Sequence, residues 1–363
     1  MRGRGGACLD LPGNEFVGGL PRRLCLTPFP AGRYHLPMKR VFSGVQPSGN
    51  LTIGNYLGAL RQFTELQQDH ECFFCVVDLH ALTLPQEPDT LRAKTLEVAG
   101  LILAAGLDPK RIVLFVQSHV PAHAELCWLL NGVTYTGELS RMTQYKDKAK
   151  GRKVITAGLL NYPILMAADI LLYRSDLVPV GADQKQHLEL ARDIAIRFNN
   201  RFGNTFVVPE PFIPKVGAKI AALDDPSKKM SKSSEVAESY IALLDPPDVV
   251  AAKLGRAVTD SGREVRYDAK AKPGVSNLLT IYALCRGLSV KKAEADFAGL
   301  GYAAFKKTVA EAVNETLRPI QTRYREFTSS GAVRQVLVEG AGRAAEVSSL
   351  VLRQVKEKMG LLI

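Results

Sequence analysis

Three short apolar runs, separated by segments with helical patterns, constrain this chain to a buried parallel sheet. The runs are RVFSGVQ (Arg40–Gln46), CFFCVVD (Cys72–Asp78) and RIVLFVQ (Arg111–Gln117). Their apolar character is nearly continuous, which indicates strands covered by helices on both faces, as in βαβ units. For the helix between the second and third runs, Asp89 is the expected N-cap and Gly106 the expected C′ residue. The start of the chain's ordered part is therefore predicted to be βαβαβ.

The remaining pattern predicts the domain organisation. Helical patterns cover about 121–150, 158–173 and 184–199, with a short strand at 176–180, and from Glu235 onward the chain reads as helical apart from 262–274. The predicted fold class is α/β, with a Rossmann-like parallel sheet as catalytic domain and a C-terminal helical domain. We expect a disordered extension over 1–37, the α/β domain over 38–234 with a helical insertion at about 121–160, and the helical region over 235–363. The last helix would be able to pack back on the α/β domain.

Composition narrows the class of protein without choosing a function. The chain has 363 residues, 46% of them hydrophobic, and six cysteines, which favours a reducing compartment over a disulfide framework. No apolar run approaches the roughly 18 residues of a membrane span, so no membrane association is expected. Of the formal net charge of +11, the first 40 residues carry +5, from seven basic and two acidic side chains. The surplus favours a polyanionic partner but does not specify one.

The first 37 residues allow three interpretations. They are rich in Gly, Pro and Arg and have no sustained period, which is typical of a disordered extension. They could also be an organellar transit peptide, although Asp10 and Glu15 weaken that interpretation. A third alternative is that translation starts at Met38, directly before the first strand. We expect a cytoplasmic protein, or an organellar one if the leader is a transit peptide.

The segment after the first strand, PSGNLTIGNYLGAL, is rich in glycine and begins a helix. In a doubly wound sheet, ligands bind beyond the carboxyl ends of the strands, where the first βα turn presents a helix N-terminus. Backbone N–H groups and the helix dipole favour phosphate there, and Gly44, Gly49, Gly54 and Gly58 lack a Cβ that would hold a nucleotide away. By itself the segment indicates a phosphate site only weakly, because glycines also serve loops and packing.

A second segment, DPSKKMSKSSE (Asp225–Glu235), places three lysines and four serines in one short loop. Lys229 and Lys232 can converge on one anion. A solvated lysine linker is the competing interpretation. Together with the glycine-rich turn, the loop is predicted to clamp phosphate.

These segments resemble the two nucleotide signatures of the class I aminoacyl-tRNA synthetases. The first signature is TIGN (Thr52–Asn55) and the second is KMSKS (Lys229–Ser233). GVQPSGNLTIGNYLGAL, YPILMAADILLY and PVGADQKQH resemble the bacterial-type tryptophanyl-tRNA synthetases, and the resemblance runs from about Lys39 to the C-terminus. It implies activation of L-tryptophan by ATP with Mg²⁺, transfer to the 2′-hydroxyl of the terminal adenosine of tRNA(Trp), a homodimer, and an anticodon-binding surface after Glu235.

The resemblance also implies the site residues. The lysines expected to act on the phosphates as catalytic residues are Lys229, Lys232 and Lys148. The nucleotide-binding set is expected to be Gln46, Pro47, Ser48, Gly54, Asn55, Gly181, Asp183, Lys229, Met230, Ser231 and Lys232. The tryptophan-binding set is expected to be Phe42, Gly44, Gln46, His80, Tyr162, Met166, Asp169 and Gln184. No metal site on the protein itself is implied, because Mg²⁺ would arrive with ATP.

Chain length favours an aromatic amino acid independently of the resemblance. The two signatures are separated by 177 positions, from Thr52 to Lys229, and the sheet, its helices and a modest insertion fill them. No room remains for an editing domain, which small aliphatic substrates require because one methylene discriminates by only about 1–3 kcal/mol. Asp169, inside an apolar run, could accept an indole N–H or a tyrosine hydroxyl. Tryptophan over tyrosine therefore rests on the resemblance, and a synthetase-like RNA-binding paralogue without adenylation is the alternative outside enzymes.

Overall fold

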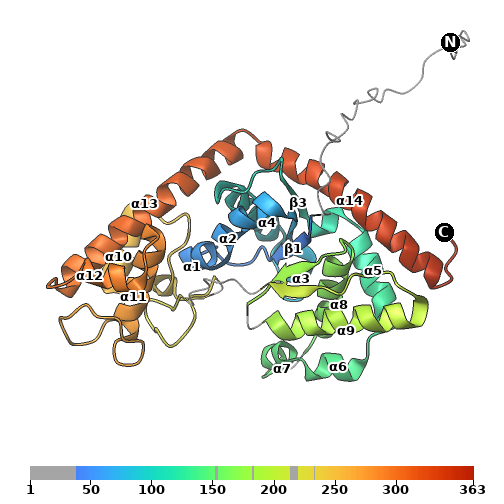
Figure 1. The fold of residues 1–363 in the computed structure, drawn as a ribbon, viewed down its shortest axis with the longest axis horizontal. Coiled ribbons are helices and arrows are strands. Elements are labelled where there is room, and N and C mark those ends of the chain that lie inside the picture. Colours follow the sequence, from blue (N-terminus) through green and yellow to red (C-terminus); the bar gives the residue numbers. More distant parts are fainter. Residues whose placement is uncertain (1–37, 152–153, 182–183, 213–219, 233) are drawn as a thin grey trace, which may run out of the picture. The chain divides into compact units, whose positions relative to one another are not determined.

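A five-stranded parallel sheet in the order β3-β2-β1-β4-β5 forms the centre of the computed structural model (Figure 1). The structure describes residues 38–363 except 152–153, 182–183, 213–219 and 233. The strands are β1 (Arg40–Val45), β2 (Glu71–Val76), β3 (Ile112–Val116), β4 (Leu177–Pro179) and β5 (Glu210–Phe212). The predicted α/β class with a helical C-terminal region is confirmed. Strand β5 was not predicted, because its three residues, Glu-Pro-Phe, carry no apolar run.

Helices alternate with the strands in this half of the chain. They are α1 (Ile53–Asn55), the π-helical turn η1 (Tyr56–Leu60), α2 (Arg61–Asp69), α3 (Asp78–Ala81), α4 (Pro88–Ala104), the 3₁₀ turn η2 (Gln117–His119), α5 (Ala122–Asn131), α6 (Thr136–Arg141), α7 (Thr143–Ala149), α8 (Ala157–Leu171) and α9 (Lys185–Phe202). The expected N-cap Asp89 is wrong by two residues. Glu87 is the N-cap, because Pro88 has the fixed φ suited to the first helical position. Gly106 follows the helix with a φ of +113°.

The C-terminal region is helical. It comprises the 3₁₀ turn η4 (Ala237–Ser239), α10 (Pro247–Arg256), α11 (Pro273–Arg286), α12 (Val290–Ala295), α13 (Tyr302–Ser329) and α14 (Ala332–Lys358). Residues Met38–Ile363 form one compact unit. None of the described helices combines the length and the apolar character that crossing a membrane requires.

The sheet separates two hydrophobic cores. Cys72, Phe74 and Leu114 face one core together with side chains of α4, α11 and α13. Cys75 and Phe115 face the other, with side chains of α5, α8 and α9. Cys72 and Cys75, a C-x-x-C pair in sequence, therefore lie on opposite faces of β2 and cannot share a metal ion.

Helix α14 covers the open edge of β3. Arg343 Nη1 donates to the Ile112 carbonyl at 2.9 Å, and a Cβ on Gly340 would lie 1.8 Å from the Leu114 carbonyl oxygen. Only a glycine permits this approach. Leu337, before the crossing point, belongs to the first core, and Val351, after it, belongs to the second. One helix thus blocks the sheet edge, which would otherwise be free to pair with another chain, and connects both cores.

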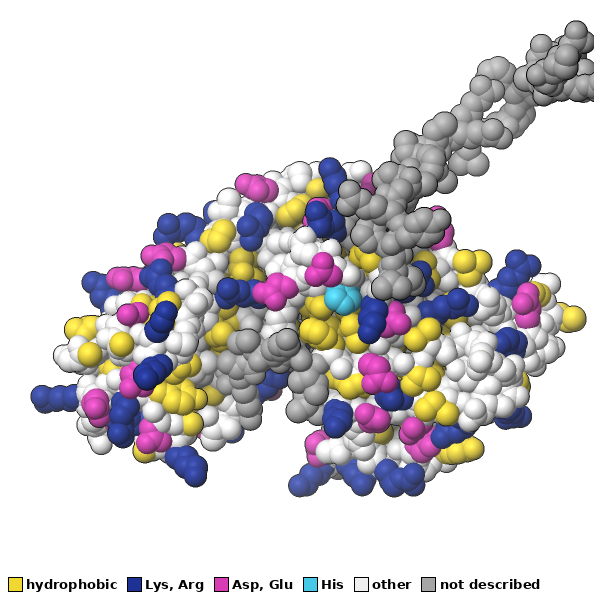
Figure 2. All heavy atoms as spheres, viewed as in Figure 1, with side chains coloured by type: hydrophobic (Ala, Val, Ile, Leu, Met, Phe, Trp, Pro, Cys, Tyr) yellow, Lys and Arg dark blue, Asp and Glu magenta, His cyan; other side chains and the backbone are white. Residues whose placement is uncertain are grey.

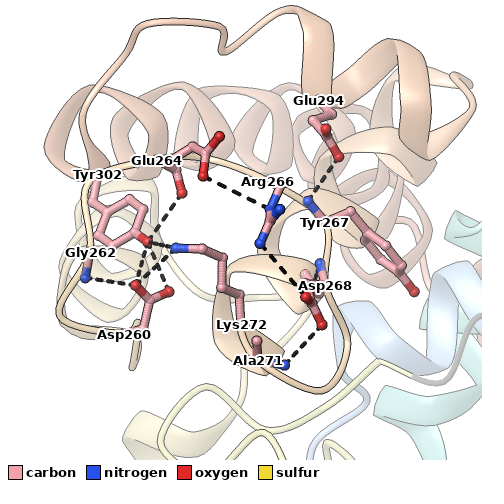
Figure 3. A network of polar contacts seen from close by, with 11 residues as sticks. Asp260, Gly262, Glu264, Arg266, Tyr267, Asp268, Ala271, Lys272, Glu294 and Tyr302 are labelled. Carbon is pink, nitrogen blue, oxygen red and sulfur yellow. Dashed lines mark hydrogen bonds and ion pairs between the residues drawn. The ribbon is translucent and has the colours of Figure 1, made fainter.

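The loop between α10 and α11 is held by a polar network rather than by regular structure (Figure 3). The Asp260 carboxylate accepts from Gly262 N at 2.7 Å, Lys272 Nζ at 3.0 Å and the Tyr302 hydroxyl at 2.8 Å. Desolvation would raise the pKa of Asp260, but these hydrogen bonds outweigh it and lower the pKa to about 2. Because Tyr302 begins α13, the network ties the loop to that helix.

The contact between α14 and β3 predicts a large penalty for one added methyl group. Gly340→Ala forces α14 away from β3, and we expect the free energy of unfolding to fall by about 3 kcal/mol. Gly342→Ala, two residues along the same helix, meets open space and should be neutral or gain about 0.5–1 kcal/mol from helix propensity. Urea denaturation of both variants measures the difference, and equal stabilities would contradict the described packing.

Candidate active site

The first signature is built as a capped helix start directly after β1. Thr52 is the N-cap of α1: its hydroxyl accepts from Asn55 N at 3.2 Å, and Asn55 Oδ1 accepts from Thr52 N at 2.9 Å. This capping box fixes the end of the first turn, residues 46–51. The π-helical turn η1 follows at once, and such turns are frequent at functional sites.

Gly54 brings the two signatures into contact. A Cβ at this position would lie 3.3 Å from Thr52 Oγ1 and 3.5 Å from the sulfur of Met230 in the second signature. Gly58 has open space around it. At Gly54, the group that approaches the backbone of the glycine-rich segment closely is therefore the second signature of the same chain.

Backbone hydrogen bonds join the signatures, although 177 positions separate them. Asn50 N donates to the Lys232 carbonyl at 3.0 Å, Ile53 N donates to the Ile241 carbonyl at 2.9 Å, and Leu243 N donates to the Leu51 carbonyl at 2.8 Å. The second signature is also tied to the segment before it, because Met230 N donates to the Ile220 carbonyl at 3.0 Å. The two phosphate-binding candidates thus form one structure.

Lys232 is the lysine that this arrangement brings to the first turn. Its Nζ donates to the Gln46 carbonyl at 2.6 Å. Burial disfavours the charged form and lowers the pKa of Lys232 to about 8. A carbonyl dipole neutralises little of the ammonium charge, so the side chain is ready to meet an anion at the carboxyl end of β1.

The other two lysines of the loop differ from Lys232. Lys228 pairs with Asp225 at 2.9 Å and is largely exposed. Lys229 is exposed, and the described residues form no ion pair with it. Of the three, Lys229 and Lys232 therefore keep charges that a polyphosphate could use.

The second half of the site centres on a buried carboxylate, Asp169 on α8, which is 1% exposed. His80 Nε2 donates to its Oδ2 at 2.7 Å, while His123 Nδ1 at 2.6 Å and Gln117 Nε2 at 2.7 Å donate to its Oδ1. Burial alone would raise the pKa of Asp169, but the charges and hydrogen bonds of His80 and His123 outweigh it and hold the pKa well below its usual range. The carboxylate is therefore ionised.

An aromatic stack supports this network from behind. The Tyr173 hydroxyl lies 2.8 Å from His123 Nε2, and the Tyr173 ring is stacked on Phe42 and Phe73 with centroids 5.5 and 4.7 Å apart. Because a carboxylate can only accept, His123 Nδ1 carries the proton of the bond to Asp169, and the Tyr173 hydroxyl holds the other ring nitrogen in place. Burial raises the pKa of Tyr173 well above its usual range, so the hydroxyl keeps its proton.

Tyr162, also on α8, forms the side of the site nearest the insertion. Its hydroxyl shares a 2.7 Å hydrogen bond with His187 Nε2, and burial raises the pKa of Tyr162 to about 12. Lys148 on α7 holds its ammonium 5.0 Å from the centre of the Tyr162 ring, and the His80 ring meets the Tyr162 ring edge-on at 6.4 Å. The insertion lysine thus lies against the same tyrosine as the predicted amino-acid pocket.

The remaining predicted site residues differ in how far they are exposed, from buried to exposed. Gly44 is exposed near the carboxyl end of β1, and Ser48 N donates to the Gln46 carbonyl at 2.9 Å. Pro47 is buried, Met166 is half-buried on α8, and Ser231 is exposed. Gln184 is the N-cap of α9, and its N donates to the Gly181 carbonyl at 3.0 Å. Asp183 lies outside the described residues.

Sequence reasoning missed Gln117, His123, Tyr173 and His187. A signal existed for the first two, because an ionised Asp169 inside an apolar helix requires buried donors. His123 also stands four positions after His119, a spacing that suits two metal ligands. Among the described residues no group of three His, Cys, Asp or Glu side chains is arranged to hold a metal ion. Instead, His123 binds Asp169.

Comparisons with known proteins agree with this architecture. Residues 37–318 match the family described as tRNA synthetases class I (W and Y). A tryptophan–tRNA ligase of Caldanaerobacter subterraneus subsp. tengcongensis is 59% identical over 326 residues, 90% of this chain and 99% of that protein. A crystal structure of tryptophanyl-tRNA synthetase from Mycoplasma pneumoniae has a TM-score of 0.83 at 38% identity, covering 90% of this chain and 98% of that one. The tryptophanyl-tRNA synthetase from Campylobacter jejuni, solved in complex with ADP and tryptophan, has a TM-score of 0.77 at 34% identity, covering 89% and 100%.

The Asp169 network predicts an acid-sensitive stability. His123→Leu leaves the carboxylate buried without one donor, and we expect the free energy of unfolding at pH 7 to fall by about 3–5 kcal/mol. Because the pKa of Asp169 is lowered in the folded protein, its contribution is present above the unfolded pKa of about 4 and is lost below it. In the variant this loss should begin at a higher pH.

Urea unfolding at several pH values between 3 and 7 measures both effects. His119→Leu is the matched control, because His119 is exposed on η2 only four residues away, and it should change stability by no more than about 0.5 kcal/mol. Equal losses in the two variants, or an unchanged pH profile in His123→Leu, would refute the assigned role of the network.

Proposed function

The chain belongs to the class I tRNA synthetases of the tryptophan and tyrosine family, and from this premise we propose that it is a tryptophan–tRNA ligase. It activates L-tryptophan with ATP, giving tryptophanyl-adenylate and pyrophosphate, and then transfers tryptophan to the 2′-hydroxyl of the terminal adenosine of tRNA(Trp). The observation that carries the proposal is the Lys232 ammonium, held 2.6 Å from the Gln46 carbonyl where the two signatures meet. It places a positive charge at the turn where a class I site binds phosphate.

The chemistry of activation needs no protein nucleophile. The tryptophan carboxylate attacks the α-phosphorus of ATP in line, and the bond to the pyrophosphate leaving group breaks as negative charge accumulates there. Lys232 and Lys229 are the proposed catalytic residues for this charge, with Lys148 approaching from the insertion. Mg²⁺ bound by the phosphates would supply further positive charge. Removing one such donor typically costs about 3–4 kcal/mol of transition-state stabilisation.

The nucleotide would lie along the first turn and the second signature. Gln46, Pro47, Ser48, Gly54 and Asn55 are proposed to border it on the β1 side, with Met230 and Ser231 on the other. Gly181 is proposed to border the nucleotide, and Asp183, which lies outside the described residues, is proposed to lie near the ribose. The capping box at Thr52 supports this arrangement, because it fixes the start of α1 and with it the end of the turn after β1.

Asp169 is the proposed acceptor of the indole N–H. A carboxylate offers about four lone-pair positions, and His80, Gln117 and His123 use three of them. The remaining position is on Oδ2, which receives only His80 among the described residues. Met166 and Phe42 are proposed to border the ring, Gly44 to leave room for it, and Tyr162 and Gln184 to contact the α-ammonium and carboxylate.

Two alternative functions can be distinguished from a tryptophan–tRNA ligase: a tyrosine-specific ligase and an RNA-binding paralogue. A tyrosine-specific relative would also use an aspartate, but the Caldanaerobacter relative, at 59% identity, is a tryptophan–tRNA ligase. A paralogue that binds RNA without adenylation would not need a buried, ionised Asp169 or a desolvated Lys232, both of which cost folding free energy. The site therefore favours the ligase.

The second half-reaction requires a surface for tRNA, which we propose in residues 235–363. This region has 19 Lys and Arg against 15 Asp and Glu residues, and on the face drawn in Figure 2 basic and acidic side chains are interspersed. Phosphate contacts would make tRNA binding depend on salt. We also propose that the protein is cytoplasmic and forms a homodimer. Trp128 on α5 and Tyr135 before α6, which are 77% and 61% exposed, are aromatic side chains suited to such a contact.

ATP–pyrophosphate exchange tests the function. With chains starting at Met1 and at Met38, we expect exchange with tryptophan and none with tyrosine, at equal rates in both chains if the first 37 residues are dispensable. Exchange with tyrosine would mean that the pocket around Asp169 is misread. Absence of exchange with either amino acid, while binding of RNA persists, would favour the paralogue.

The lowered pKa of Lys232 predicts proton uptake on ATP binding. At pH 8 about half of the side chains are neutral in the free protein, because the pKa is about 8, and a bound polyphosphate raises it. ATP binding should therefore take up about half a proton at pH 8, and ATP affinity should fall as pH rises further. Calorimetric titrations in two buffers of different ionisation enthalpy measure the uptake, which Lys232→Met should abolish and Lys229→Met should retain. Equal heats in both buffers would contradict the assignment.

A further inference from the structure

The side chain of Asn50 links three parts of the chain beside the second signature. Its Oδ1 accepts from Lys94 Nζ on α4 at 2.7 Å, and its Nδ2 donates to the Tyr240 hydroxyl at 3.0 Å. Its own backbone N donates to the Lys232 carbonyl at 3.0 Å. Asn50 was not among the residues that the sequence or the resemblance implied.

The partners of Asn50 fix its orientation. An ammonium group can only donate, so the amide oxygen must face Lys94 and the amide nitrogen must face Tyr240. Lys94 is held in turn by both oxygens of Glu97, at 2.8 and 3.0 Å. On the other side Tyr240 is buried, with the Lys253 ammonium 4.9 Å from its ring centre and Lys253 paired to Asp245 at 2.7 Å. Both ends of the Asn50 amide therefore meet groups that are themselves fixed.

Packing alone would not hold Asn50 in place. A cavity of about 210 Å³ lies beside it, lined by Asn50, Leu51, Glu97, Leu101, Ala242, Leu244 and Asp245. A side chain without its two hydrogen bonds has room there to take another rotamer. Gly49 precedes it with a φ of +66°, in the left-handed region, so the peptide that enters Asn50 belongs to a tight turn whose orientation depends on its flanking contacts.

From this geometry we propose that Asn50 is a positioning residue for Lys232. The side-chain amide of Asn50, held between α4 and Tyr240, fixes the position of the Asn50 backbone N–H, which donates to the Lys232 carbonyl. This bond in turn fixes the backbone of Lys232 and therefore the position of its ammonium at the first turn. The inference rests on the proposed function, because it concerns the phosphate chemistry of the same site. It adds that α4, which supplies none of the predicted site residues, determines through Lys94 where the catalytic lysine lies.

Asn50→Leu tests the inference, because leucine has nearly the same shape and loses both side-chain hydrogen bonds while keeping the backbone N–H. In ATP–pyrophosphate exchange we expect kcat to fall at least about 10-fold, part of the 10²–10³ typical for losing a transition-state donor. The KM for tryptophan should stay within about 2-fold, and proton uptake on ATP binding at pH 8 should change. Loss of a residue with a purely structural role would not lower kcat while leaving the KM for tryptophan unchanged.

Three further variants sharpen the experiment. Asn50→Asp keeps the acceptor for Lys94 and can accept from Tyr240, so it should restore most of the rate. Lys94→Met and Tyr240→Phe each remove one of the two bonds and should each give a smaller loss, which keeps the test available if Asn50→Leu fails to fold. Arg92→Met is the matched control, because Arg92 lies on α4 in an exposed pair with Asp89 and should leave the rate unchanged.

The outcomes separate the two proposals. A wild-type chain without exchange activity would overturn the proposed function and this inference with it. An active wild type with Asn50→Leu as active as Arg92→Met would overturn only the inference. A parallel loss of tryptophan affinity and kcat in Asn50→Leu would also overturn it, since that result would indicate general damage to the site.

Discussion

The backbone pairing between residues 50–53 and the segment that follows the second signature is the interaction on which the rest of the site depends. The bonds from Ile53 to Ile241 and from Leu243 to Leu51 close a loop of nearly two hundred residues. The C-terminal helices stabilise this closure directly. Asn277 on α11 binds both the N–H and the carbonyl of Ala221, and Gln321 on α13 donates to the Leu243 carbonyl. The helical region is therefore part of the framework that holds the two signatures together, in addition to its proposed role in binding tRNA.

The sheet imposes a second constraint, because a parallel sheet must be covered on both faces and at its edges. Helix α14 meets both needs at β3, with Gly340 at the crossing point and Arg343 bonded to the Ile112 carbonyl. The same helix carries the buried Ser348, whose hydroxyl lowers the pKa of Tyr173 by hydrogen bonding against a larger rise from burial. The C-terminal helix thus reaches the back of the Asp169 network, so the packing of α14 is mechanically connected to that network.

Sequence patterns predicted the parts of this structure that depend on local composition. Continuous apolar runs located β1, β2 and β3, and the two signatures located segments that the structure joins by backbone hydrogen bonds. Contacts between distant positions could not be predicted in the same way. Asp169 is 89 positions from His80 and 46 from His123, so the sequence shows that the carboxylate needs donors but not which ones. Asn50 and Lys94 carry no signal of their own, because an exposed-looking amide and a helix lysine occur in any soluble chain. The β5 strand is set by pairing with β4, since its own residues have no strand pattern.

The two desolvated charges of the site, Asp169 and Lys232, are stabilised in opposite ways. Asp169 keeps its charge because three donors surround it before any ligand arrives. The side of the site proposed to bind the amino acid is therefore preorganised, and the desolvation of the carboxylate is already offset in the folded protein. Lys232 has only a carbonyl dipole for its charge, and its lowered pKa shows that the desolvation is not offset. In the proposed reaction, the polyphosphate of ATP supplies the missing counter-charge. Part of the free energy of nucleotide binding would then hold the Lys232 ammonium where negative charge develops on the leaving group. An interaction that is stronger in the transition state than in the ground state accelerates the reaction. An acidic side chain already paired with Lys232 would remove that advantage. The lysine would have to break this ion pair to reach the phosphates, so its stabilisation of the transition state would be smaller.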